Sequence, residues 1–213
     1  MSLPLVIAGI GTDVGKTVVS ALICRQEQID YWKPIASGSE DGPVDHEILR
    51  GLLSDCAVNV HEPRYTFKKS LSPHVAADFE GRDVDLEALV EIPKGDRGIL
   101  IELAGGVLVP LNDSYTNLDL VAKWRCGVIV VSRHYLGSIN HTLLTLEALR
   151  SRGAHVLGVV FNGDELPDTE RIISKLGMVN ILGRVPRLPA VTAATIQELA
   201  NAQVVELPDL TQG

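Results

Sequence analysis

Nine residues near the amino terminus, Gly9-Ile10-Gly11-Thr12-Asp13-Val14-Gly15-Lys16-Thr17, have the composition of a loop that binds a polyphosphate. Glycines let the backbone approach phosphate groups and turn its N–H groups toward them. Lys16 can reach the outer phosphates, and the Thr17 hydroxyl is an oxygen ligand suited to Mg²⁺. We therefore expect a nucleotide to be bound by Asp13, Val14, Gly15, Lys16, Thr17 and Val18.

The sequence around this loop has the order of a phosphate-binding unit. An apolar run, residues 5–8, precedes the loop, and a helical pattern, residues 18–25, follows it. The usual motif has four residues between its first glycine and Gly-Lys-Thr. Five residues follow Gly9 before Gly15, so the loop is a longer variant. The alternative, a plain glycine-rich turn, fits this context less well.

Two further segments carry charged or polar side chains just after apolar runs. Glu102 lies near the end of one run and is a candidate Mg²⁺ ligand, since ligands bind at the carboxyl ends of parallel strands. Gly105 and Gly106 after it would let a substrate approach backbone N–H groups. Lys33 and Ser37 follow another run and would add a cation and a hydrogen bond beside Lys16. The alternatives are a solvent-facing acid and an ordinary loop.

Three other positions have both a structural and a functional interpretation. Asp45 is either a charge at the start of a helix or a third group that holds Mg²⁺. Ser138 is expected to cap a helix whose first-turn N–H groups, through Ile139 and Asn140, could receive a carboxylate. Asn162 ends an apolar run and could read a nucleobase through its amide. The guanine-reading Asn-Lys-x-Asp pattern is absent, which favours adenine, and the base could be flanked by Pro186, Arg187 and Leu188.

The remaining sequence predicts an α/β fold that places these residues at one edge of a sheet. Apolar runs alternate with helical patterns, and continuous rather than alternating apolar character indicates strands covered on both faces. This predicts a mostly parallel sheet with helices on both faces, in a single P-loop domain spanning residues 1–213. Strands are expected at 5–8, 31–34, 99–103, 128–131, 156–161 and 179–182. Helices are expected at 18–25, 44–54, 73–79, 86–92, 118–124, 138–152, 168–176 and 191–200.

Composition narrows the functional classes. The net charge of −8 and the lack of a basic stripe argue against nucleic acid as a partner. No stretch approaches the ~20 apolar residues of a membrane span. Cys24, Cys56 and Cys126 are odd in number and widely spaced, which fits reduced thiols in a cytoplasmic protein.

Taken together, these segments resemble the dethiobiotin synthetase family of P-loop enzymes. The matching features are the Gly9 loop, Lys33-Pro-Ile-Ala-Ser-Gly-Ser-Glu40, Ser72-Pro-His74, Glu102-Leu-Ala-Gly-Gly106, Leu136-Gly-Ser-Ile-Asn-His141 and Asn162. The combination of the P-loop with Lys-Pro-x-Ala-Ser-Gly is far more specific than either segment alone. The resemblance implies closure of a ureido ring on 7,8-diaminononanoate with CO₂, ATP and Mg²⁺, through a carbamate and a carbamic-phosphoric anhydride.

The resemblance also implies roles for the residues. Lys16, Lys33, Thr12 and Ser37 would stabilise the anionic carbamate and phosphoryl groups, and Thr17, Asp45 and Glu102 would hold Mg²⁺. The diamine end of the substrate would lie near Ser72 and the Gly105–Gly106 loop. Its carboxylate would reach the helix start at Ser138, Ile139 and Asn140 of a second subunit, which implies a homodimer.

Some positions depart from the family pattern, and two alternatives stay open. Leu103 stands where the family commonly has glycine, which predicts a narrower substrate pocket, and Arg133-His134-Tyr135 replaces a simpler stretch. The first alternative is a cobyrinate-type amide ligase, but the chain has no room for the glutaminase domain that such enzymes usually carry. The second is a nucleotide-dependent switch ATPase of the partition or septum-site type. Those proteins have a second lysine five residues before the P-loop lysine, and that position here is Gly11.

Overall fold

The apolar runs of the sequence form the strands of a six-stranded sheet in a computed structural model that describes residues 3–208. The strand order is β2-β5-β1-β6-β7-β8, and every neighbouring pair is parallel. The strands span Leu5–Gly9 (β1), Asp30–Trp32 (β2), Ile99–Gly106 (β5), Gly127–Arg133 (β6), His155–Asn162 (β7) and Ile181–Val185 (β8). Most of their central residues are fully buried, as expected for a sheet covered on both faces.

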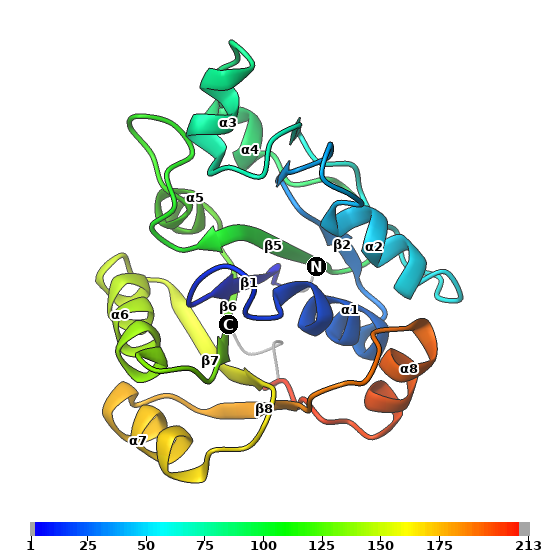
Figure 1. The fold of residues 1–213 in the computed structure, drawn as a ribbon, viewed down its shortest axis with the longest axis vertical. Helices are drawn as coiled ribbons and strands as arrows, with labels where there is room; N and C mark the ends of the chain where they lie inside the picture. Colours follow the sequence, from blue (N-terminus) through cyan, green and yellow to red (C-terminus); the bar gives the residue numbers. More distant parts are fainter. Residues whose placement is uncertain (1–2, 209–213) are drawn as a thin grey trace.

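Helices cover both faces of this sheet, so the predicted fold class is confirmed (Figure 1). Three pack together on one side: α1 (Lys16–Glu27), α2 (Asp45–Leu52) and α8 (Ala193–Asn201). On the other side lie α5 (Asn117–Lys123), α6 (Ser138–Ser151) and α7 (Pro167–Gly177). The short helices α3 (Pro73–Phe79) and α4 (Leu86–Val90) lie beyond the β2 edge. None of the helices in residues 3–208 is both long and apolar enough to cross a membrane.

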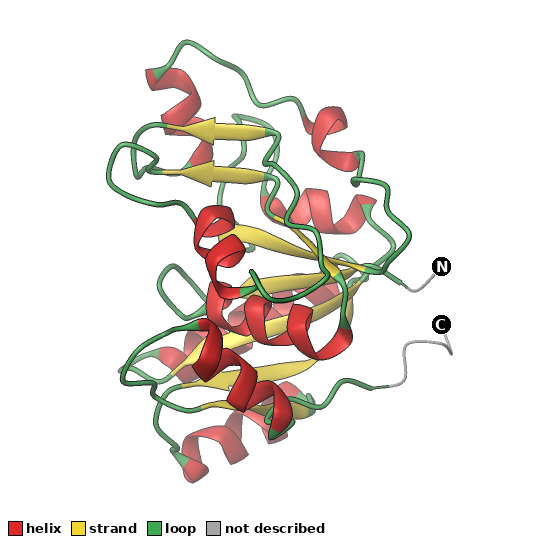
Figure 2. Cartoon of the chain, turned by 90° about the vertical axis from the view of Figure 1, so that its right-hand side faces the viewer, coloured by secondary structure: helices red, strands yellow, loops and turns green. Residues whose placement is uncertain are grey.

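A second, two-stranded sheet was not predicted from the sequence. It pairs β3 (Ile35–Ser37) with β4 (Tyr65–Phe67) in parallel and lies beside the main sheet (Figure 2). Strands of three residues are too short to produce a periodic pattern, and these two are stabilised by burial, since Ala36 and Phe67 are fully buried. Ser37 is the last residue of β3, so this small sheet determines where Ser37 lies.

The parallel arrangement brings the ends of four strands to one edge of the molecule. The P-loop leaves β1 there, Glu102 lies in β5, and Arg133 and Asn162 end β6 and β7. Because parallel strands all end at the same edge, segments far apart in the sequence meet at this edge.

The three cysteines are free thiols, as the sequence predicts. Cys24 and Cys126 are buried, and burial raises the pKa of Cys126 to about 12. These two thiols are therefore packing residues of the core rather than reactive groups.

Candidate active site

The P-loop is shaped by Gly9 and Gly15, where a Cβ atom would come too close to neighbouring atoms. Gly15, which precedes α1, has a φ of 95°, and a Cβ there would lie 2.0 Å from Nδ2 of Asn162. A Cβ on Gly9 would lie 2.8 Å from the carbonyl oxygen of Gly11 and 3.0 Å from Cδ of Lys16. Nζ of Lys16 donates to that same Gly11 carbonyl at 2.9 Å. The loop thus folds tightly around the buried stem of Lys16.

Next to the loop, four polar side chains from four parts of the chain meet in one cluster. Oγ1 of Thr17, in the first turn of α1, lies 2.7 Å from Oδ1 of Asp45 and 3.1 Å from Oε1 of Glu102. Lys33 Nζ donates to Asp45 Oδ2 and, at 3.1 Å, to Glu102 Oε1. Asp45 begins α2, so its helix-start position and its place in the cluster are compatible.

The charges of this cluster stabilise one another in a buried environment. Burial lowers the pKa of Lys33, but Glu102 and Asp45 outweigh burial, so the pKa of Lys33 is raised. Burial favours the neutral form of Asp45, but the ammonium of Lys33 holds the pKa of Asp45 below its ordinary value. Lys16 differs, because burial lowers its pKa and the nearby carboxylates do not fully offset that effect. The charged form of Lys16 is therefore less stabilised than that of Lys33, and a bound anion would stabilise it further.

The donor set fits Mg²⁺. Thr17, Asp45 and Glu102 present only oxygen atoms, which Mg²⁺ prefers, and Glu102 is completely buried. Within residues 3–208 no group of three or more His, Cys, Asp or Glu side chains is placed to hold a metal ion. A cation here would thus need further oxygen ligands, which phosphate groups and water commonly supply to Mg²⁺.

A cavity of about 560 Å³ opens beside the cluster, between the P-loop, β3 and the end of β5. Its lining includes seven of the predicted site residues: Thr12, Asp13, Lys33, Ser37, Asp45, Ser72 and Gly105. Among residues 3–208 the buried Oγ of Ser37 has no hydrogen-bond partner, so this hydroxyl is free to bind a ligand in the cavity. Ser70 and Leu71 also line the cavity and were not predicted, because they precede the recognised Ser72-Pro-His74 motif and have no motif of their own.

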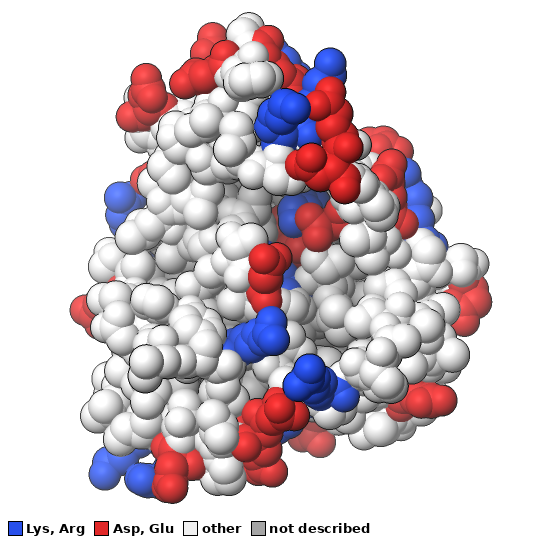
Figure 3. Space-filling model, viewed as in Figure 1, with Lys and Arg blue, Asp and Glu red and all other residues white. Residues whose placement is uncertain are grey.

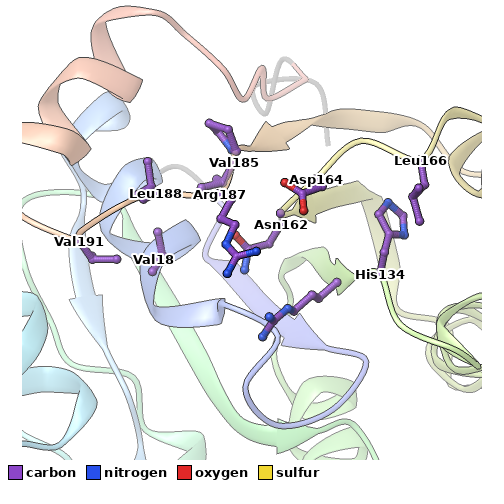
Figure 4. A pocket seen from close by; sticks show the side chains of 12 residues that line it. Val18, His134, Asn162, Asp164, Leu166, Val185, Arg187, Leu188 and Val191 are labelled. Carbon is purple, nitrogen blue, oxygen red and sulfur yellow. The ribbon is translucent and has the colours of Figure 1, made fainter.

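A second cavity, of about 420 Å³, lies where β7 and β8 end (Figure 4). It is lined by the predicted base-binding residues Asn162, Pro186, Arg187 and Leu188, together with Val18. Asn162 Nδ2 donates to the Val14 carbonyl at 3.0 Å, so this amide also ties the cavity to the P-loop.

Two residues of this second cavity, Arg133 and His134, were missed in the sequence. They belong to the stretch that departs from the family pattern. Nη1 of Arg133 donates to the Asp13 carbonyl at 3.4 Å, which places that side chain beside the P-loop.

Gly106 and the helix-start residues do not line the cavity beside the cluster. The N-cap of α6 is Gly137, with a φ of 103°, and Ser138 is the first helical residue, so the prediction that Ser138 caps this helix was wrong. A glycine provides the left-handed backbone that the chain needs at this turn, and a serine would be strained there. Ser138, Ile139 and Asn140 line neither of the two cavities of their own chain.

Leu103 does not narrow the cavity beside the cluster, contrary to expectation. Successive strand residues point to opposite faces, so Leu103 points away from the face that carries Glu102 and Ala104. Its side chain is 1% exposed and belongs to the core, whereas Ala104 and Gly105 line the cavity.

The face of the molecule that bears these cavities is hollowed in its middle (Figure 3). Basic and acidic side chains gather around the hollow, while much of the surrounding surface is uncharged. Such a concave site, with few charged groups converging on it, is typical of a small-molecule site.

Comparisons with known proteins find similar sequences over most of the chain. A family described as AAA domain matches residues 4–195. The chain is 41% identical over 213 residues to the ATP-dependent dethiobiotin synthetase BioD of Nitrobacter hamburgensis, covering 100% of this chain and 99% of the relative. It is 44% identical over 193 residues to the BioD of Paramagnetospirillum magneticum, covering 91% and 92%.

Solved structures share the fold at much lower identity. The septum site-determining protein MinD from Pyrococcus horikoshii, complexed with Mg-ADP, superposes with a TM-score of 0.58 at 15% identity and covers 96% of this chain and 93% of that one. A ParA family ATPase from Chlorobium tepidum gives 0.56 at 11% identity, covering 96% and 91%. At such identities the likeness establishes the fold and nothing about activity.

Proposed function

The chain belongs to the ATP-dependent dethiobiotin synthetase family, and from that premise we propose how its residues perform the reaction of that family. The enzyme is a ligase that forms carbon–nitrogen bonds in biotin biosynthesis. Its substrates are 7,8-diaminononanoate, CO₂ and ATP, and residues 1–213 act as one ligase domain.

The reaction has three steps. One amine of the diamine attacks CO₂ and loses a proton, which gives a carbamate. A carbamate oxygen attacks the γ-phosphorus of ATP, ADP leaves, and a carbamic-phosphoric anhydride forms. The second amine then attacks the carbonyl carbon, phosphate leaves with the bonding electron pair, and loss of a proton completes the ureido ring. No protein nucleophile is needed.

The carbamate and the transferred phosphoryl group are both anionic. The side chains of Lys16 and Lys33 would supply the positive charge that stabilises them. Lys33, Thr12 and Ser37 line the first cavity, and Lys16 lies close enough to Lys33 for their charges to interact. Fixed positive charge stabilises a developing anion best in a site from which water is excluded. Lys16 and Lys33 are only 6% exposed each, which supports this role.

We assign the ATP site to the P-loop and the second cavity. Asp13 to Val18 would hold the phosphates, and Asn162 would read adenine with Pro186, Arg187 and Leu188 along its edge. Thr17, Asp45 and Glu102 would hold Mg²⁺, which when bound neutralises charge on the phosphates. The oxygen-only donor set supports this assignment.

The diamine end of the substrate would occupy the first cavity, near Ser72 and the Gly105–Gly106 loop. Its carboxylate would bind the start of α6 of a second subunit, so that the active site depends on a homodimer. Two observations support this. The α6 start lines neither cavity of its own chain, and Tyr135, Leu136 and Leu144 beside it are exposed large hydrophobic residues. We expect the enzyme to work in the cytoplasm.

The single observation that carries the proposal is the cluster in which Lys33 joins Asp45 and Glu102 beside the P-loop. The experiment supplies purified protein with diaminononanoate, ¹³C-bicarbonate, ATP and Mg²⁺, and analyses the product by mass spectrometry. We expect a cyclic product that carries ¹³C in its ureido carbon, formed with equimolar ADP. Formation of ADP with no labelled product would contradict the proposal.

A further inference from the structure

Glu102 is held from both of its oxygens, and the two sets of donors differ in kind. Oε1 faces the cluster already described, where it is 3.1 Å from Oγ1 of Thr17 and 3.1 Å from Nζ of Lys33. Oε2 faces the core, where it accepts hydrogen bonds from Oγ of Ser20 at 2.8 Å and from the phenol of Tyr31 at 3.1 Å. The buried carboxylate thus contacts four polar side chains, two at each oxygen.

The two donors on Oε2 have no freedom to leave. Ser20, in α1, Tyr31, in β2, and Glu102 are each 0% exposed, so neither hydroxyl can turn to solvent. The Glu102 carboxylate is consequently held in one orientation, and Oε1, which contacts Thr17 and Lys33, is the oxygen that faces the cluster.

We propose that Ser20 and Tyr31 are positioning residues that reserve one oxygen of Glu102 and thereby select a small octahedral cation at the Thr17–Asp45–Glu102 site. The inference rests on the proposed magnesium site. Mg²⁺ requires near-ideal octahedral geometry with short bonds, and a single carboxylate oxygen satisfies one of its positions. Ca²⁺ takes more ligands at longer distances and commonly binds both oxygens of a carboxylate. Withholding Oε2 therefore disfavours Ca²⁺ more than Mg²⁺.

The test measures metal preference rather than turnover. Wild type, Ser20→Ala, Tyr31→Phe and the double variant are loaded with a non-hydrolysable ATP analogue and with Mn²⁺, which stands in for Mg²⁺ and is detected by electron paramagnetic resonance. Ca²⁺ is then added as a competitor. We expect the double variant to lose preference for Mn²⁺ over Ca²⁺ by roughly 10–100-fold, the range seen when groups that orient metal ligands are removed. Each single variant should lie between the double variant and wild type.

Matched controls remove the same chemical groups elsewhere. Tyr65→Phe deletes a phenol that accepts from the Asp85 amide, and Ser174→Ala deletes a hydroxyl that donates to the Val179 carbonyl. Both should keep the wild-type preference. A folded double variant with the wild-type preference, or controls that change it equally, would overturn the inference. If the single variants alone fold, their ratios decide in the same way.

A Glu102→Gln arm separates this inference from the proposal beneath it. If that variant binds Mn²⁺ as tightly as wild type, Glu102 is not a ligand, and the magnesium site and the inference both fail. If Glu102→Gln loses Mn²⁺ while the Ser20 and Tyr31 variants keep the wild-type ratio, only the inference fails.

Discussion

Lys33 and Asp45 are the residues on which the proposed chemistry depends most. The Lys33 ammonium forms ion pairs with Asp45 and with Glu102, and Lys33 and Asp45 also line the first cavity. Each of these charges also affects the stability of the fold, because removing one would leave its buried partner unpaired, which is costly. Substitutions here should therefore change catalysis and stability separately, and the two effects can be measured apart.

Lys33→Gln should abolish most turnover while ATP still binds. The variant removes a cation from the reacting groups but leaves the P-loop contacts of Lys16 intact. We expect kcat to fall by about 10²–10³, as for removal of a group that stabilises a developing anion. Isothermal titration with ATP should give an affinity close to wild type. Lys123→Gln, which removes an exposed lysine paired with Glu87, serves as the control. Loss of ATP binding in Lys33→Gln would make Lys33 a nucleotide contact instead.

The pairing of Asp45 predicts a dependence of stability on pH. The folded-state pKa of Asp45 lies below its ordinary value of 3.8, so its ionised form stabilises the fold above that pH. This contribution is lost as pH falls through the folded-state pKa. The difference in unfolding free energy between wild type and Asp45→Asn should thus be constant near neutral pH and shrink below about pH 4. Urea unfolding at a series of pH values measures it, and a difference that grows on acidification would contradict the assignment.

At the scale of elements, the loops that follow the strands position the site residues. The sequence predicted some of these elements better than others. The central strands and the helices produce long patterns, and every predicted helix and strand has a counterpart in the structure. The β3–β4 pair and the capping role of Gly137 were missed, since three-residue strands have no period and a cap depends on backbone torsion. Ser20 and Tyr31 were missed because nothing local marks a hydroxyl that bonds to a residue far along the chain.

Recognition of the site residues depended on motifs rather than on periodicity. The P-loop and the Lys33–Ser37 segment were recognisable because each chemistry needs its residue types in a fixed local order. The structure brings Thr12, Lys33, Ser37, Ser72 and Gly105 around one cavity. Their catalytic roles remain predictions, as does the cross-subunit role of the α6 start.

Gly15, in the turn between β1 and α1, is the position where a substitution tests the backbone geometry of the P-loop. Gly15→Ala would force a Cβ into a left-handed backbone and into the Asn162 amide. We expect a loss of about 1–3 kcal/mol of unfolding free energy, typical of a strained φ, together with weakened ATP binding. Gly51→Ala is the matched control, because Gly51 lies in α2 with open space around its Cβ position and should gain about 0.5–1 kcal/mol. Thermal unfolding and nucleotide titration check both variants. Equal effects at the two glycines would contradict the account.

At the scale of the whole molecule, the fold leaves the proposed active site incomplete within one chain. The P-loop, the cluster around Lys33 and both cavities lie at one edge of the sheet. The start of α6 lines neither cavity. A second copy is the occupant that the proposed carboxylate contact requires. This makes subunit mixing an informative experiment.

Two inactive variants should restore each other when they share a dimer. Lys33→Gln disables the cavity of its own chain, and Asn140→Asp places a negative charge where the substrate carboxylate would bind. Randomly mixed dimers should regain about a quarter of the wild-type sites, since each mixed dimer has one intact site. Steady-state activity before and after unfolding and refolding the mixture together measures this. Absence of any recovery, with mixed dimers confirmed by native mass spectrometry, would mean that each chain works alone.

The central claim is that ATP is consumed to close a ring on a diamine and not to drive a switch. The most direct measurement is phosphate release from ATP by the purified protein, with diaminononanoate and bicarbonate added singly and together. The account predicts phosphate release only when both are present, at a rate that matches ring formation. Release at the same rate from ATP alone would contradict it.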